Sequence, residues 1–385
     1  MHDTGKAFVQ FFVSLKLTVV LLALSAILVF AATLDQTHLG IWGIQEKWFR
    51  SLVVLQDFKG VPVPIFPGGY FIGTLLLINL IAAHIYRFTF NWKKSGIFIT
   101  HLGLIILLVG ELLTNLWQQD FQMRLTEGES KNYSESPRKN ELAVIDTTDP
   151  EYDHVVAIPE ALLRPGKSLQ TPKLPFRLVV RDYFPNASLQ MRSQVPNAPA
   201  SLATTGIGPQ VAVTPLPMTY KENETNVPAA YVELIGPQGS INTWLFSTAL
   251  TDQTFQFEGK TYRFVLRPER FYTKFTVSLL KFSHDRFAGT EIDKNFSSRV
   301  RLQTDDGSTD REVLIYMNNP LRFQGLTFYQ AGYDGDKTTF LQVVKNPSWL
   351  LPYVACAMIF AGLVIQFGLS LVGFAKKRSN QLAVA

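Results

Sequence analysis

Two ionisable side chains lie inside an otherwise apolar stretch of the sequence, residues 96–117. They are His101 and Glu111, in the segment GIFITHLGLIILLVGELLTNLW. An ionisable group inside a membrane span is costly, so it indicates a functional site. Imidazole is also a usual protein ligand for haem iron and for many transition metals. The stretch therefore predicts either a metal ligand at His101 or a histidine that only lies near the membrane edge.

A second histidine, His84, lies near the end of the preceding apolar stretch. If the two stretches are antiparallel helices joined by a short link, His84 and His101 fall at similar depth. A rise of 1.5 Å per residue puts His101 roughly 8 Å beyond Gly96. His84 is shallower, and the simpler interpretation is an imidazole that reaches the interface. Glu111 lies near the opposite end, where we expect it to be hydrated or paired.

The remaining polar groups have simpler interpretations. Asn79, in the middle of its apolar stretch, is expected to make an interhelical hydrogen bond. Four histidines lie outside the apolar stretches and are most simply surface or terminal residues: His2, His38, His154 and His284.

Four apolar stretches are long enough for a helix to cross the hydrocarbon core, which takes ~20 residues. The predicted spans are residues 17–34, 70–86, 96–117 and 347–374. The competing reading of the first is a cleaved signal peptide, with Ala31-Ala32-Thr33 as the cleavage site. The length of the run and the spans that follow favour an uncleaved helix.

The composition changes between residues 118 and 346, where apolar residues alternate with polar ones and turn residues recur. Alternation of this kind predicts antiparallel strands, most simply packed as a sandwich. Residues 185–230 are rich in Pro, Ala, Thr and Asn and predict an irregular excursion. The predicted strands are 176–181, 261–266, 276–279, 300–302 and 313–316. The fold class is thus an integral membrane protein with four transmembrane helices and a large all-β domain between the third and fourth.

Positive charges set the expected orientation, because cytoplasmic loops are enriched in Lys and Arg. They gather before the first span, between spans two and three, and after span four. With alternating spans all three groups lie on one side, so we expect a bacterial inner-membrane protein with both termini cytoplasmic. The basic residues are Lys6, Lys16, Arg87, Lys93, Lys94, Lys376, Lys377 and Arg378. Residues 1–16, 87–95 and 375–385 are then cytoplasmic, and the loop 35–69 and the domain 118–346 are extracytoplasmic.

The sequence lacks the motifs that are typical of several functional classes. The sequence has a single cysteine, Cys356, and no CxxC redox or CxxCH haem-attachment motif. It has no nucleophile elbow, phosphate-binding glycine loop or HExxH motif. The net charge of +5 is scattered, without the basic stripe of a nucleic-acid-binding protein.

Three segments carry a resemblance to a known family. The span THLGLIILLVGELLT, the passage 274–302 and the motif VLIYMNNPLRFQGLTFYQAGYD at 313–334 resemble the ResB (CcsB-like) family of system II cytochrome c biogenesis proteins. In the last motif the matching positions are Asn319, Pro320, Gly325, Phe328, Tyr329 and Gln330. Three N-terminal spans, an outer β-domain and one C-terminal span also match the family architecture.

The resemblance implies a function and partners. It implies a subunit, not catalytic alone, of a holocytochrome c synthase complex that exports haem b and attaches it to the CxxCH thiols of apocytochrome c. The implied partners are a tryptophan-rich ResC/CcsA-like membrane subunit, apocytochrome c and a thioredoxin-like reductant of the ResA/CcsX type. The family's transmembrane haem-iron ligand falls on His101. His84 stays a second candidate, and the other axial ligand could come from the partner.

A different class of function remains open. In this alternative the chain is a membrane-anchored scaffold whose β-domain binds a partner without contacting haem. A small-molecule transporter is disfavoured, because four spans without an internal repeat do not resemble known transporter folds.

Overall fold

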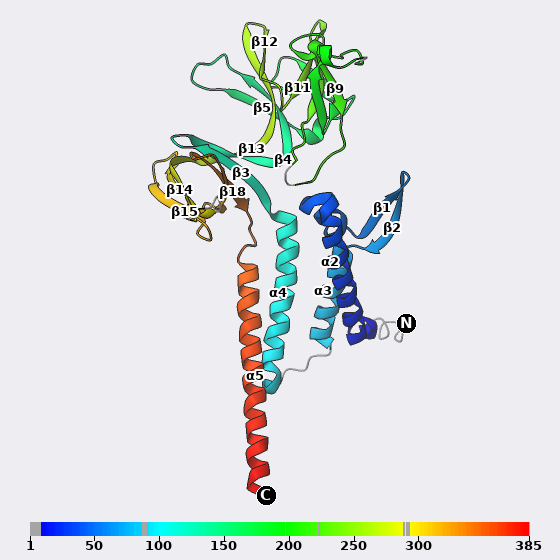
Figure 1. The fold of residues 1–385 in the computed structure, drawn as a ribbon, viewed down its shortest axis with the longest axis vertical. Helices are drawn as coiled ribbons and strands as arrows, with labels where there is room; N and C mark the ends of the chain where they lie inside the picture. The colour runs from blue at the N-terminus through cyan, green and yellow to red at the C-terminus, as the bar shows by residue number, and fades with distance from the viewer. Residues whose placement is uncertain are drawn as a thin grey trace. The chain divides into compact units, whose positions relative to one another are not determined.

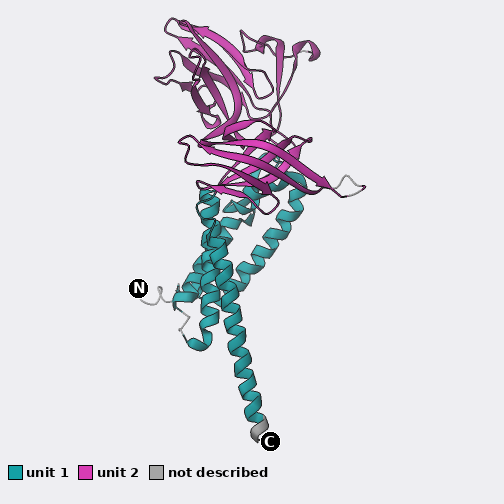
Figure 2. Cartoon of the chain, turned by 90° about the vertical axis from the view of Figure 1, so that its left-hand side faces the viewer, with its two compact units in different colours: residues 1–118, 220–223, 346–385 teal, residues 119–219, 224–345 magenta. Residues whose placement is uncertain are grey.

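The computed structural model describes residues 9–86, 91–196, 198–221, 224–287, 289 and 293–384 (Figure 1). His2, Lys6 and Arg87 lie outside these residues. The chain divides into two compact units (Figure 2). Unit 1 comprises residues 1–118, 220–223 and 346–385, and unit 2 comprises residues 119–219 and 224–345.

Unit 1 is built on helices. Within the described residues, four helical segments are long and apolar enough to cross a membrane. The chain is thus a membrane protein with four candidate spans, as predicted. The helices are α2 (Leu15–Ile44), η1 (Gln45–Phe49), α3 (Gly69–Tyr86), η2 (Trp92–Lys94), α4 (Ser95–Trp117) and α5 (Leu351–Val384).

Helix α2 extends well beyond the expected span 17–34. Ser14 caps its start, where the side chain accepts a hydrogen bond from the backbone N–H of Lys16. The helix is interrupted only at Gly40, whose φ of 71° is a left-handed conformation that glycine adopts without strain. Residues 35–49, expected to be part of a loop, therefore continue the helical path.

A hairpin of β1 (Val53–Phe58) and β2 (Val61–Pro67) joins this path to α3. Its turn is Lys59-Gly60, both with positive φ, as a two-residue type I′ turn requires. The base of the hairpin packs against the helices through Val54 and Phe66, which contact a core that includes Trp48.

Unit 2 is an all-β domain, as the alternating pattern predicts. Each of its strand pairings is antiparallel. Its strands are β3 (Gln119–Thr126), β4 (Ser130–Asp146), β5 (His154–Pro159), β6 (Ser168–Leu169), β7 (Arg177–Phe184), β8 (Ala187–Met191), β9 (Val211–Pro215), β10 (Ala229–Gly236), β11 (Gly239–Ser247), β12 (Gln253–Phe257), β13 (Lys260–Arg286), β14 (Asp293–Thr304), β15 (Asp310–Tyr316), β16 (Leu321–Phe323), β17 (Leu326–Asp334) and β18 (Thr338–Lys345).

Two hydrophobic cores share the long strand β13. The first core lies between the sheet β11-β10-β7-β6 and the part of β4 and β13 around Val144 and Phe264. The second core fills the other end of β13, around Val277, and takes buried side chains from β3, β14, β15, β17 and β18. The two segments predicted as separate strands, 261–266 and 276–279, are therefore parts of one 27-residue strand.

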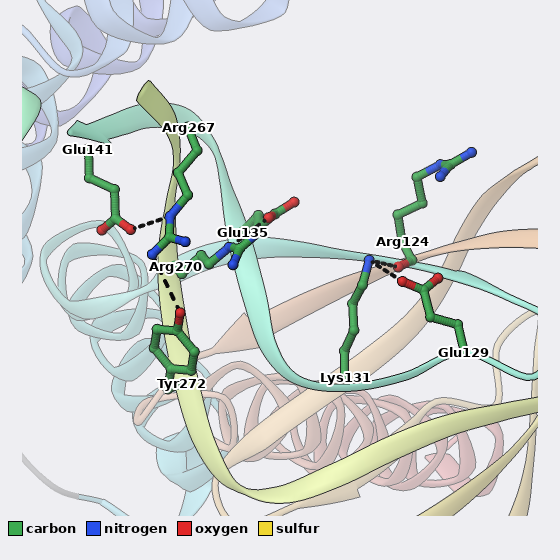
Figure 3. A network of polar contacts seen from close by, with 8 residues as sticks. All are labelled: Arg124, Glu129, Lys131, Glu135, Glu141, Arg267, Arg270 and Tyr272. Atoms are coloured by element: carbon green, nitrogen blue, oxygen red, sulfur yellow. Dashed lines mark hydrogen bonds and ion pairs between the residues drawn. The ribbon is translucent and has the colours of Figure 1, made fainter. Parts of the chain in front are cut away.

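Charged and aromatic side chains lie along the stretch of β4 and β13 that connects the two cores (Figure 3). There β4 and β13 pair for only three residues, between two register shifts. The Nε of Arg267 donates to Glu141 at 2.9 Å, and the Nε of Arg270 donates to Glu135 at 3.0 Å. Both side chains of the Arg267–Glu141 pair are buried, so removing either one would leave the other charge buried without compensation.

The excursion predicted at residues 185–230 is more ordered than its composition indicates. β8 and β9 form a small sheet, and Ala187 and Val211 contribute to a separate core. At the far edge of the domain, hydrogen bonds from Thr148 and Lys260 lower the pKa of Asp146 to about 2.

Candidate functional site

The structure brings the two intramembrane histidines together. His84 lies on α3 and His101 on α4, and their ring centroids are 6.4 Å apart with the planes inclined at 67°. Both residues are half-buried, and both ring nitrogens of His84 are inaccessible to solvent. The predicted similarity in depth is thus confirmed, and it places two imidazoles side by side in an apolar setting.

The spacing can be compared with that of a shared metal ion. An imidazole nitrogen lies roughly 2 Å from a bound metal, so two rings that ligate one ion from opposite sides have centres roughly 6 Å apart. The observed 6.4 Å is in this range. Within the described residues no group of three or more metal-ligating side chains exists. The two imidazoles can supply two ligands to one metal ion, the number that the axial positions of haem iron take.

Phe98 is a neighbour of this pair that the sequence did not single out. Its ring packs against His84 with centroids 4.5 Å apart and planes inclined at 30°. Stacking covers a face of the imidazole and not the edge that carries the nitrogens. Phe98 precedes His101 by three residues on α4, so both contact His84 from the same helix face.

The opposite face of α4 packs against α5. Gly96, Gly103 and Gly110 recur every seven residues and are buried. A Cβ added at Gly96 would lie 2.5 Å from the carbonyl oxygen of Gly362, so the two backbones are close. Five residues at 100° each put His101 roughly 140° around the helix from Gly96. The glycines thus admit a neighbouring helix, and the histidine faces away from it.

Helix α3 is fixed to α2 by Asn79. This buried side chain donates to the carbonyl of Phe12 at 2.6 Å and accepts from the hydroxyl of Thr18 at 2.6 Å. The interhelical hydrogen bond predicted for Asn79 is confirmed. Because Asn79 lies five residues before His84, this anchor also restrains the position of the imidazole.

Glu111 lies apart from the histidine pair. It is ten residues beyond His101 on α4, roughly 15 Å along the axis. Its side chain is exposed, and its backbone carbonyl accepts from Asn115 at 3.1 Å. The structure therefore does not bring Glu111 into the candidate site.

The other described histidines are also separate. His38 and His154 are exposed, as expected of surface residues. His284 is not a simple surface residue, because its side chain is only 13% exposed and stacks on Tyr333 at 5.0 Å. Its burial comes from the pairing of β13 with β14 and from the contact with Tyr333 of β17, which local sequence does not reveal.

Part of the chain is similar to a known protein family. Residues 246–340 match the ResB-like family. The match lies within the β-domain, from the end of β11 to β18, and contains the whole motif at 313–334. It does not include His84 or His101.

A second similarity covers more of the chain. The chain is similar to Protein NrfI of Wolinella succinogenes, with 23% identity over 293 residues. The alignment covers 75% of this chain and 29% of the relative, so the chain spans less than a third of that protein's length.

Proposed function

We propose that this ResB-like protein is the subunit of a system II cytochrome c biogenesis complex that holds haem b in the membrane through His101 and His84. The observation that carries the proposal is the 6.4 Å approach of the two imidazole rings between α3 and α4. The haem is a substrate that passes through, and the complex attaches it to the CxxCH thiols of apocytochrome c.

The chemistry expected of the histidines follows from their basicity. A neutral imidazole binds iron and a protonated one does not, so haem binding competes with protons at this site. His101 is the primary ligand in this proposal, because it lies deeper from the helix end than His84. His84 is the second imidazole, restrained by Asn79 on one side and Phe98 on the other.

The proposed orientation puts this site near the cytoplasmic face. Lys93 and Lys94 in η2 directly precede α4, and Lys376 and Lys377 lie near the C-terminal end of α5. By the positive-inside rule these ends are cytoplasmic. Haem made in the cytoplasm then meets His84 and His101 first, and the β-domain lies on the outer side.

The outer steps are divided between the β-domain and partner proteins. The β-domain presents apocytochrome c, or shapes the chamber in which thioether bonds form. A tryptophan-rich ResC/CcsA-like subunit carries the outer haem, and a thioredoxin-like reductant keeps the apocytochrome thiols reduced. The family similarity of the β-domain supports this division of roles, since the matched residues lie there.

The test is the haem content of the purified membrane complex. We expect His101→Ala to reduce the bound haem at least tenfold and His84→Ala to reduce it severalfold. His154→Ala is the matched control, because this exposed histidine lies in the β-domain. If the double variant His84→Ala/His101→Ala retains wild-type haem, the site is wrong and the scaffold function is favoured.

A further inference from the structure

The β1–β2 hairpin exposes an unusual amount of apolar surface. Its outward face carries Val53 and Leu55, and Leu55 is 51% exposed. By the strand register, Pro64 lies opposite Leu55 on this face, whereas Phe58, Val61 and Val63 are exposed on the other face. Exposed apolar side chains gathered on one element indicate a binding surface for a protein or a membrane. The hairpin had no role in the sequence interpretation, where it was part of a loop.

The polar groups of the hairpin are confined to two places. Asp57 and Lys59 lie at the turn, where the carboxylate of Asp57 accepts from the backbone N–H of Gly60 at 2.7 Å. Gln56 turns toward the helices and accepts from Lys47 at 2.7 Å. The outward face between the base and the turn therefore presents only apolar side chains, which need no hydrogen-bonding partner.

The depth of the hairpin follows from the helices that flank it. Helix α3 has 18 residues and so is about 27 Å long, slightly less than the ~30 Å of hydrocarbon that it must cross. The hairpin ends at Pro67, two residues before α3 begins. Its base therefore lies at the boundary between the hydrocarbon and the headgroups.

A polar cluster gives the same depth from the other helix. Asp35 lies 20 residues after the start of α2, or about 30 Å along the axis. Its carboxylate accepts from the Nζ of Lys47 and the Nε1 of Trp48, each at 2.8 Å. Lys47 also holds Gln56 of β1. A tryptophan and an ion pair of this kind are typical of the membrane interface.

The edge of the hairpin argues against another strand as its partner. Pro62, Pro64 and Pro67 lie on β2 and have no N–H to donate, so this edge is blocked for strand addition. What remains is a face that is apolar, lies at interfacial depth and continues the lipid-facing surfaces of α2 and α3. Figure 1 shows the hairpin beside these two helices.

We infer that the β1–β2 hairpin is an interfacial anchor whose outward face inserts into the acyl region of the leaflet around the C-terminal end of α2. The occupant of this face is lipid, and the charged turn lies among the headgroups. The anchor fixes the outer ends of α2 and α3 relative to the bilayer surface. This inference depends only on membrane insertion and not on haem binding.

Site-directed fluorescence tests the inference on the full chain in lipid nanodiscs. The background is Cys356→Ala, which removes the single cysteine. An environment-sensitive probe is attached at Leu55→Cys, with Val53→Cys as a second position on the same face. Phe30→Cys on α2 is the lipid-facing reference. Leu314→Cys on β15 is the matched control, because it is an apolar strand residue with a similar exposure of 44%.

Two quenchers separate the possible outcomes. We expect lipids with a nitroxide high on the acyl chain to quench the probe at residue 55 at least threefold more than at residue 314. Aqueous iodide should quench residue 314 and spare residue 55. The inference is overturned if residue 55 behaves like residue 314, which means that the face is in water. It is equally overturned if residues 53 and 55 are shielded from both quenchers, which means that protein covers them.

Discussion

Helix α4 has two contact faces, which differ in the size of the side chains that lie between the helices. Toward α5 the face is lined by Gly96, Gly103 and Gly110, and the helix backbones come close together. Toward α3 the face carries Phe98 and His101, and larger side chains separate the helices. Close backbone packing is how membrane helices associate without a hydrophobic driving force.

The difference assigns separate tasks to the two faces. The glycine face leaves no room for a ligand, so it holds α4 in place. The histidine face is built from rings whose nitrogens can bind a metal, and it is positioned by the rigid glycine face behind it. A site supported in this way keeps its geometry when the ligand leaves. The faces should therefore respond to substitution in different ways.

Overfilling the glycine face should have the largest effect on stability. In Gly96→Leu the added atoms meet the backbone of Gly362, and overpacking of this kind costs about 1–3 kcal/mol or more. We expect a lower unfolding midpoint and a poor yield in detergent. Gly73→Leu on α3 is the control, because a Cβ there meets nothing within 4 Å. Equal midpoints for the two variants would contradict the close packing.

Removing the histidines should leave the fold and reduce ligand binding. We expect His101→Ala to lose at least tenfold in haem affinity, which is about 1.4 kcal/mol, and to keep its unfolding midpoint. His84→Ala should lose less. Titration of purified protein with haem measures the affinity. If the unfolding midpoint fell together with the haem affinity, the histidine face would contribute to stability as the glycine face does. That result would contradict the distinction between the two faces.

Asn79→Leu should affect both properties modestly. The substitution removes the hydrogen bonds to Phe12 and Thr18, and interhelical bonds in membranes contribute about 0.6 kcal/mol on average. We expect a small decrease in stability and a decrease in haem affinity smaller than that of His84→Ala. Unchanged haem affinity would show that this anchor does not restrain His84.

Acid should slightly lower the stability of the β-domain through the contact of Asp146 with Lys260. The pKa of Asp146 is lowered to about 2, so its stabilising effect is present above the unfolded value near 4 and is lost as pH falls toward 2. Because Lys260 is exposed, solvent screens this pair and we expect its contribution to stability to be small. Asp146→Asn should remove that pH dependence, as measured by denaturant unfolding at pH 2 to 5.

The sequence predicted the spans, the β-class of the domain and the common depth of His84 and His101. These features follow from hydropathy, alternation and helix rise, which are local. It did not predict Phe98 against His84, because that contact depends on how α3 rotates about its axis. It did not predict the close packing of α4 on α5 at Gly96, Gly103 and Gly110, because local sequence does not specify which helix lies beside them.

The β-domain shows the same limit. The strand β13 looked like two strands, because Pro268 and the polar residues after it interrupt the alternation. In the structure these residues are the stretch of β13 that connects the two cores, where Arg267 pairs with Glu141 and Arg270 with Glu135. Similarly, β8 and β9 were hidden by proline-rich composition, and their pairing brings together residues that are distant in sequence.

Rescue by free imidazole tests the central claim most directly. His101→Gly removes the proposed ligand and leaves a space of its shape, which added imidazole can fill. We predict that the purified complex of this variant lacks the haem absorption band and regains it in millimolar imidazole. His154→Gly should keep the band throughout. A His101→Gly complex that carries wild-type haem without imidazole would contradict the proposal that this histidine binds the iron.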